Sequence, residues 1–158
     1  MRTLPENYKI VEALAPAADA GGRTSDWVSL KNVQRLWIFA HVNQGAAATI
    51  ALVPKQATDV AGAGVKNLTS AARIWANQDC AASDALPQQT DATSFTTDAG
   101  VKHKLVVFEV DPAGLDISGG FDSVAIATGA SDAANITEAL FVAELRYGSA
   151  SPPSIITD

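Results

Sequence analysis

The sequence has a single cysteine, Cys80, which excludes an internal disulfide and a cysteine-based zinc site. Cys80 lies among small and polar residues, so we expect it in a loop. The sequence also lacks the run of about 18 apolar residues that a membrane-spanning helix needs. A chain of 158 residues still buries about 70% of its unfolded surface on folding. We therefore expect one domain that is stable without a disulfide or a bound metal.

Positive charge is scarce, because 11 Lys and Arg stand against 17 Asp and Glu, for a net charge of −6. A protein that neutralises phosphates needs clustered basic residues. The densest basic stretch is residues 102–104 (KHK), and we interpret it as the solvated end of a strand. The composition therefore predicts no nucleic-acid partner and no anionic membrane partner.

No long segment has the 3.6-residue period of an amphipathic helix. Short apolar runs separated by turn residues recur instead, and about eight of them predict an all-β fold, an antiparallel β-sandwich that is jelly-roll-like. Single helical turns are expected near Gln56 and Pro112. The predicted strands cover residues 9–14, 27–30, 33–43, 46–53, 71–77, 90–97, 104–110, 121–128 and 139–147.

The segment 33–43 (VQRLWIFAHVN) is apolar on both faces at its centre, which is typical of a central strand. The segment 104–110 (KLVVFEV) predicts a second buried strand. Trp37 and Trp75 lie in such apolar strands, so we interpret both as core residues. The turn at 43–45 and the run that follows it predict a hairpin between 33–43 and 46–53.

Both ends of the chain have little core pattern and contain prolines, which favour extended chain. We therefore expect an N-terminal arm over 1–8, a β-sandwich domain over 9–148 and a C-terminal tail over 149–158. Disordered ends are the alternative. The candidate partner-binding residues are the apolar residues of these ends and one tryptophan that follows a loop: Leu4, Tyr8, Trp27, Ile155 and Ile156.

One motif is typical of an enzyme. Residues 118–123 (SGGFDS) match the SGGxDS signature of the PP-loop ATP pyrophosphatases, in which the motif opens a helix that holds pyrophosphate. Here the following residues predict a strand, so we interpret the motif as a glycine turn. The only histidines, His41 and His103, are not accompanied by a nucleophile elbow. The acidic residues show no metal-ligand spacing, although a surface calcium site remains an alternative. We therefore expect no catalytic, cofactor-binding or metal-binding residues, and no enzyme.

Several longer stretches together resemble a known family. These are residues 9–20 (KIVEALAPAADA), 22–32 (GRTSDWVSLKN), 74–77 (IWAN), 105–112 (LVVFEVDP) and the ending 146–153. The sequence resembles small virion proteins of tailed bacteriophages and prophages, and the likeness covers nearly the whole chain. It implies a capsid decoration (cement) protein, a class that often has a jelly-roll-like β-sandwich.

The resemblance also implies a partner and a location. The partner is the major capsid protein, whose subunits this protein bridges on the outer surface of the assembled head. Self-association as a dimer or trimer is expected, after synthesis in the bacterial host cytoplasm.

The alternatives are a phage tail or neck component, or a carbohydrate-binding sandwich for host recognition. Flat apolar patches and extended termini favour lattice binding, and exposed aromatics in a groove favour sugar binding. A cleft that joins His41 or His103 to carboxylates favours an enzyme.

Overall fold

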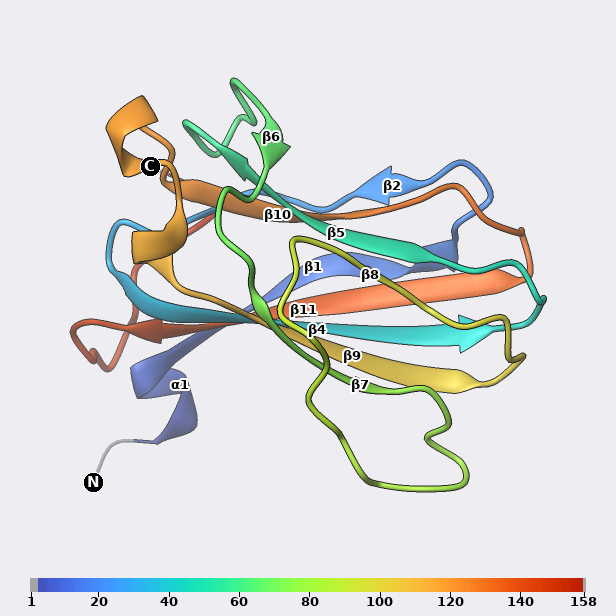
Figure 1. The fold of residues 1–158 in the computed structure, drawn as a ribbon. Helices are drawn as coiled ribbons and strands as arrows, with labels where there is room; N and C mark the ends of the chain where they lie inside the picture. The colour runs from blue at the N-terminus through green and yellow to red at the C-terminus, as the bar shows by residue number, and fades with distance from the viewer. Residues whose placement is uncertain (1–2, 158) are drawn as a thin grey trace.

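Two antiparallel sheets pack face to face in the computed structural model, which describes residues 3–157 (Figure 1). The five-stranded sheet has, in order, β1 (Tyr8–Ala18), β11 (Asn135–Leu145), β4 (Val33–Gln44), β9 (His103–Val110) and β7 (Arg73–Asn77). The six-stranded sheet contains β2 (Arg23–Thr24), β3 (Val28–Ser29), β10 (Ser123–Thr128), β5 (Ala51–Ala57), β6 (Lys66–Asn67) and β8 (Phe95–Thr96). The predicted all-β sandwich is confirmed.

The chain passes from one sheet to the other at most of its connections, which is the topology of a jelly roll. One layer has the order β1, β11, β4, β9, and the other has β2 with β3, then β10, β5 and β8. The described residues form eleven strands, two more than the nine ranges predicted. The two additional strands are the two-residue strands β2, which pairs with β10, and β6, which pairs with β5.

The predicted hairpin is wrong, because β4 and β5 lie in different sheets. β11 occupies one edge of β4, from Asn135 opposite Gln44 to Leu145 opposite Val33. β9 occupies the other edge. No edge of β4 is left for β5, which pairs with β10 instead.

The core lies between the sheets and receives alternate residues of each strand. In β11, Phe141, Ala143 and Leu145 point inward, whereas Tyr147 lies beyond the strand and is 80% exposed. The fully buried apolar residues include Val28, Leu36, Ile38, Val42, Ile50, Leu52, Ile74, Val106, Phe108, Val124 and Ile126.

One of the two predicted helical turns is present. The 3-10 helix η1 (Pro112–Gly114) begins with Asp111, whose side chain accepts a hydrogen bond from the Ala113 N–H. A second 3-10 helix, η2, covers Ile117–Gly119. The turn at Gln56 is wrong: this residue belongs to β5 and is fully buried, because pairing with β10 extends the strand to Ala57.

The N-terminus is not an extended arm over the described residues. Leu4–Asn7 form one helical turn, α1, and Tyr8 already pairs with Glu144 in the five-stranded sheet. β1 continues through Pro16, where the register shifts; an edge strand tolerates proline because its outer N–H side needs no ladder partner.

The C-terminal tail folds back onto the domain. Ser149 N–H donates to the carbonyl of Glu6, so the tail passes beside α1. The tail then reaches β3, where the Ser29 N–H donates to the Ile155 carbonyl at 2.6 Å. Ile155 is only 4% exposed and belongs to the core, so its side chain is not available to a partner as the sequence suggested.

Candidate protein-binding surface

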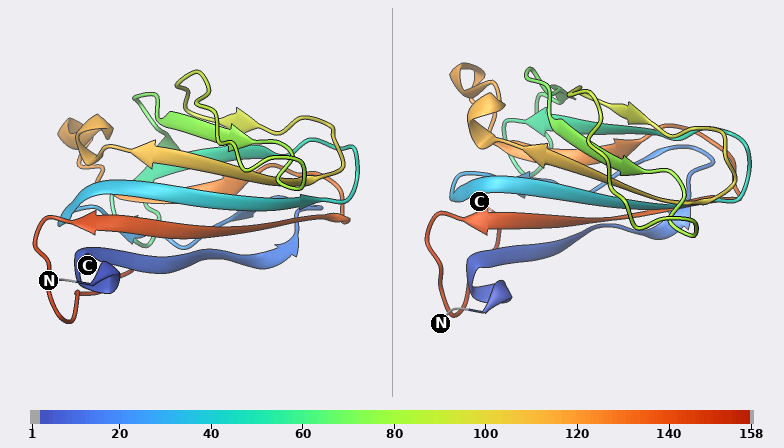
Figure 2. Two further views of the ribbon diagram at one scale, coloured as in Figure 1. Left: turned by 90° about the horizontal axis from the view of Figure 1, so that it is seen from below. Right: turned by 60° about the horizontal axis from the view of Figure 1, so that its bottom comes forward.

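The outward residues of the five-stranded sheet form an apolar surface. In β4, Leu36 and Ile38 point into the core, so the alternating Trp37 and Phe39 point outward. The antiparallel register places outward residues of β1, β7, β9 and β11 beside them. Seen from below, the five strands lie side by side, with α1 at one end and the lime-coloured loop that follows β7 crossing in front of the other end (Figure 2). We call this surface the open face; its apolar members are Tyr8, Ile10, Trp37, Phe39, Trp75, Leu105, Val107, Leu140 and Val142.

The open face combines exposed aliphatic residues with partly covered ones. Ile10 is 46% exposed and Leu140 is 45% exposed. Val107 is buried although it lies outside the core, because Phe39 and Trp75 flank it in the register. Contiguous exposed apolar residues rimmed by polar ones mark interaction sites in soluble proteins.

Ion pairs and a hydrogen bond fix the orientation of the side chains at one end of the open face. Glu109 accepts a hydrogen bond from Trp37 Nε1 at 3.1 Å and pairs with Arg35 at 3.3 Å and Arg73 at 3.5 Å. The Tyr8 ring lies 6.1 Å from the Trp37 ring, tilted by 48°. The indole of Trp37 is therefore fixed in orientation, with its only donor already used.

The other end of the open face contains a cavity and both histidines. His41 Nδ1 lies 2.9 Å from a carboxylate oxygen of Glu138, and the His103 ring stacks on His41 at 6.1 Å. The adjoining cavity has a volume of about 230 Å³. It is lined by Glu12, Leu14, Pro16, Phe39, His41, Leu105, Glu138, Ala139 and Leu140.

The His41–Glu138 pair is the kind of feature that favours an enzyme, so its surroundings decide what it can do. None of the residues that line this cavity is Ser, Thr, Cys or Lys, the usual side-chain nucleophiles beside a histidine base. Within residues 3–157, no three His, Cys, Asp or Glu side chains gather to hold a metal ion. The cavity is instead apolar inside and acidic at its rim, which suits binding of an apolar group with a positive end.

The SGGFDS motif forms the predicted turn that leads into a strand. Asp116 accepts hydrogen bonds from the Gly119 N–H and the Ser118 hydroxyl. The hydrogen bond from Lys66, followed by that from Ser118, lowers the pKa of the Asp116 carboxyl below 3.8. Gly120 takes the left-handed conformation, with φ of 80°, and β10 begins at Ser123. The interpretation as a glycine turn before a strand is confirmed.

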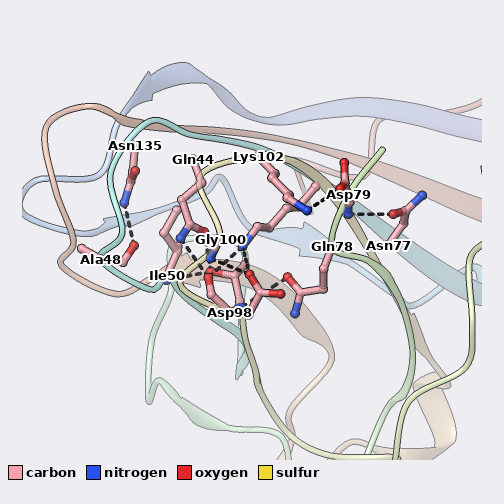
Figure 3. A network of polar contacts seen from close by, with 12 residues as sticks. Gln44, Ala48, Ile50, Asn77, Gln78, Asp79, Asp98, Gly100, Lys102 and Asn135 are labelled. Atoms are coloured by element: carbon pink, nitrogen blue, oxygen red, sulfur yellow. Dashed lines mark hydrogen bonds and ion pairs between the residues drawn. The ribbon is translucent and has the colours of Figure 1, made fainter. Parts of the chain in front are cut away.

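A buried network of polar contacts stabilises the end of the sandwich at which the two histidines lie (Figure 3). The side chain of Lys104 is fully buried, and its ammonium donates to both the carboxylate and the carbonyl of Asp98. Gln44 Nε2 donates to the same carbonyl at 2.8 Å. The hydrogen bond from Lys104 holds the pKa of Asp98 below its usual value, as the one from Lys102 does for Asp79. These partners are satisfied within the protein, which indicates a structural role.

The predicted partner-binding residues do not form one site. Leu4 is 58% exposed in α1, and Ile156 is 45% exposed in the tail. Trp27 is half-buried and packs against Gly62. The contact is close, because a Cβ atom added to Gly62 would lie 2.6 Å from the indole nitrogen of Trp27. Ile155 is in the core, so only Tyr8 contributes to the open face.

Sequence reasoning placed Trp37 and Trp75 in the core, and this is wrong. Both lie on the open face and are half-buried. The signal that could have located this surface was present in 33–43 and 104–110, which are apolar on both faces. In a two-layer sandwich only one face of a strand meets the core, so a second apolar face is left uncovered.

Among the described residues, no helix is long and apolar enough to cross a membrane. No family model and no curated protein sequence matches the chain.

Solved structures resemble the protein at low similarity. The SPBc2 prophage-derived protein YomS has a TM-score of 0.49 and 10% identity, over 87% of this chain and 94% of that chain. Desmodium yellow mottle tymovirus has a TM-score of 0.32 and 10% identity, over 91% and 90%. The family 11 carbohydrate-binding module from Clostridium thermocellum has a TM-score of 0.32 and 13% identity, over 87% and 84%. None of these three reaches a TM-score of 0.5, so they carry no argument about function.

Proposed function

We propose that this protein is a structural protein of a tailed-phage virion, a decoration protein that binds the assembled head through its open face. Bound there, it bridges major capsid subunits and stabilises the shell. The observation that carries the proposal is the apolar sheet surface with charged groups at both ends. An apolar centre with a polar rim is the anatomy of a protein–protein interface, and Trp, Tyr and Arg are the residues that dominate binding energy there.

The chemistry of the open face favours a protein partner over a sugar. A sugar platform needs free aromatic faces together with hydrogen-bonding groups, whereas Ile10, Leu140 and Val142 offer only aliphatic contact. The indole N–H of Trp37 is already bonded to Glu109. Aliphatic surface gains free energy by being removed from water, at about 25 cal/mol per Å², and a protein surface can cover it.

The virion context rests on the resemblance of residues 9–20, 22–32, 74–77, 105–112 and 146–153 to phage virion proteins. The net charge of −6 supports a position on the outside of the head, because packaged DNA repels an acidic protein. Repeated weak contacts on a lattice add through avidity, so no single strong site is required.

The proposal is tested by adding purified protein to heads that lack it and measuring the bound amount by sedimentation and mass spectrometry. The test variant is Ile10→Asp/Leu140→Asp, which places two charges on the open face. The matched control, Val65→Asp/Val101→Asp, makes the same changes at residues that are 49% and 57% exposed elsewhere. We expect the test variant to lose at least about tenfold in affinity and the control to bind as the wild type does.

The alternatives give different results. Wild-type protein that is absent from purified heads and present in tails contradicts the decoration hypothesis and supports a tail or neck component. Binding to a glycan array without binding to heads supports the carbohydrate-binding alternative.

A further inference from the structure

We infer that the cavity beside His41 receives a basic side chain, Lys or Arg, from the partner that covers the open face. The inference rests on the proposed function, because it assumes a protein partner, and it adds the chemistry of the contact. The cavity combines apolar walls with a carboxylate rim, which matches a side chain with an aliphatic stem and a cationic end.

The walls of the cavity suit the stem. Phe39, Leu105 and Leu140 belong to three adjacent strands of the sheet, β4, β9 and β11. Pro16, which belongs to β1, lines the cavity as well. These groups offer no hydrogen bonds to a polar guest, but they can cover methylene groups. A volume of about 230 Å³ is a space for one side chain, not for a segment of chain.

The carboxylates at the rim of the cavity suit the cationic end of a Lys or Arg side chain. Glu12 lies opposite Leu140 in the register, and Glu138 is the next outward residue along β11, so both carboxylates border the same cavity. Glu12 makes no hydrogen bond or ion pair with the described residues, and Glu138 pairs with His41 alone. Two carboxylates therefore keep free acceptor sites, which form strong hydrogen bonds to a cation once docking excludes water.

The opposite end of the open face lacks this capacity. Glu109 already has three donors, Trp37, Arg35 and Arg73. Arg35 and Arg73 make that end mixed in sign, whereas the cavity end has two carboxylates and no Lys or Arg among the residues that line it. The charge distribution thus directs a basic group to the cavity end.

The first test needs no capsid. The intact protein is titrated with n-butylguanidinium chloride, which reproduces an arginine stem and head, and followed by NMR. We expect saturable shifts at Phe39, Leu105 and Leu140, with a Kd on the order of millimolar, and no saturable shifts with butyrate. The double variant Glu12→Gln/Glu138→Gln should raise the Kd for n-butylguanidinium by at least about fivefold.

A matched control removes a carboxylate that is on the same face but away from the cavity. Glu144 lies opposite Tyr8 and Arg35 in the register, and Glu144→Gln should leave the Kd within about twofold of the wild type. Equal binding of butylguanidinium and butyrate, or an equal effect of the two sets of variants, overturns the inference. Far-UV circular dichroism checks that each variant is folded.

The second test separates the inference from the proposed function. If wild-type protein binds heads and Glu12→Gln/Glu138→Gln binds equally well, the inference of a basic side chain in the cavity is contradicted and the decoration function stands. If wild-type protein does not bind heads but still selects butylguanidinium, the decoration function fails and the cation preference of the cavity stands. Loss of head binding in the Glu12→Gln/Glu138→Gln variant, but not in Glu144→Gln, supports both.

Discussion

The outward faces of the two sheets differ in kind, although both sheets supply the same core. The outward positions of the six-stranded sheet carry one branched aliphatic residue, Val53, and otherwise small or polar side chains: Thr24, Ser29, Ala51, Lys55, Ala57, Asn67, Thr96, Ser123, Ala125 and Ala127. Ser29, Ala57, Ser123 and Ala125 are buried although they point away from the core. The open face of the five-stranded sheet carries four aromatic residues of its central and edge strands, Tyr8, Trp37, Phe39 and Trp75, and several branched aliphatic ones. The open face is therefore the more apolar of the two outward surfaces, as the proposed contact with a partner requires.

The sharpest way to test this difference is to compare adjacent residues on opposite faces of β11. Phe141→Ala removes a fully buried ring from the core and should lower the free energy of unfolding by about 3–5 kcal/mol. Leu140→Ala, one residue away on the open face, should cost about 1 kcal/mol at most. Chemical denaturation measures both. Equal losses would mean that the open face contributes to folding as the core does.

A second comparison concerns the two partners of one ion pair, Asp98 and Lys104. Asp98→Ala should cost about 1–2 kcal/mol, because the buried ammonium of Lys104 loses its half-exposed carboxylate partner and keeps only the carbonyl of residue 98. Lys104→Met removes the charge together with its need for a partner, so its free energy of unfolding should stay within about 1 kcal/mol of the wild type. Denaturant melts of the two variants check the order. A larger loss for Lys104→Met contradicts the structural role of this network.

The tail allows a third comparison, because it contacts the six-stranded sheet at β3 and leaves the open face free. Ile155→Ala should cost about 2 kcal/mol, since the side chain is 4% exposed. Ile156→Ala, at a residue that is 45% exposed, should change the stability by less than about 0.5 kcal/mol. Thermal and denaturant melts provide the measurement. If the two variants behave alike, the tail does not dock as the structure has it.

A fourth comparison is between neutral and acidic pH. Lysine partners lower the pKa of Asp79, Asp98 and Asp116 below 3.8, so their ionised forms are favoured in the folded state. Their contribution is fully present well above pH 3.8 and is lost as the pH falls through the lowered pKa values. The melting temperature of the wild type should therefore fall between about pH 5 and pH 2. A variant with Asn at all three positions should start lower and fall less; an equally steep fall would contradict these pairings.

Sequence patterning predicted the fold class because alternation along β10 and β11 is preserved in the folded sheets. It could not predict which strands pair. Segments 33–43 and 46–53 are adjacent in sequence with a turn between them, yet β4 finds longer partners in β9 and β11. Pairing of that kind depends on contacts between distant segments, which local pattern does not contain.

The candidate site was harder to predict than the fold. Apolar composition alone cannot tell a core face from an uncovered face, so Trp37 and Trp75 were assigned to the core. Ile155 shows the reverse error: a proline-flanked isoleucine in a weakly patterned tail looks free, but the tail returns to β3. The partner of His41 is 97 residues away in sequence, so the histidine end of the open face also becomes visible only in the folded chain.

The central claim is that the open face is the contact surface, and hydroxyl-radical footprinting tests it most directly. The protein is oxidised free in solution and bound to heads, and the modification of each residue is measured by mass spectrometry. The account predicts that Ile10, Trp37 and Leu140 become protected on heads, while Val65 and Val101 react as they do in free protein. Unchanged reactivity of Ile10 and Leu140, with protection at Val65 or Val101, would contradict it.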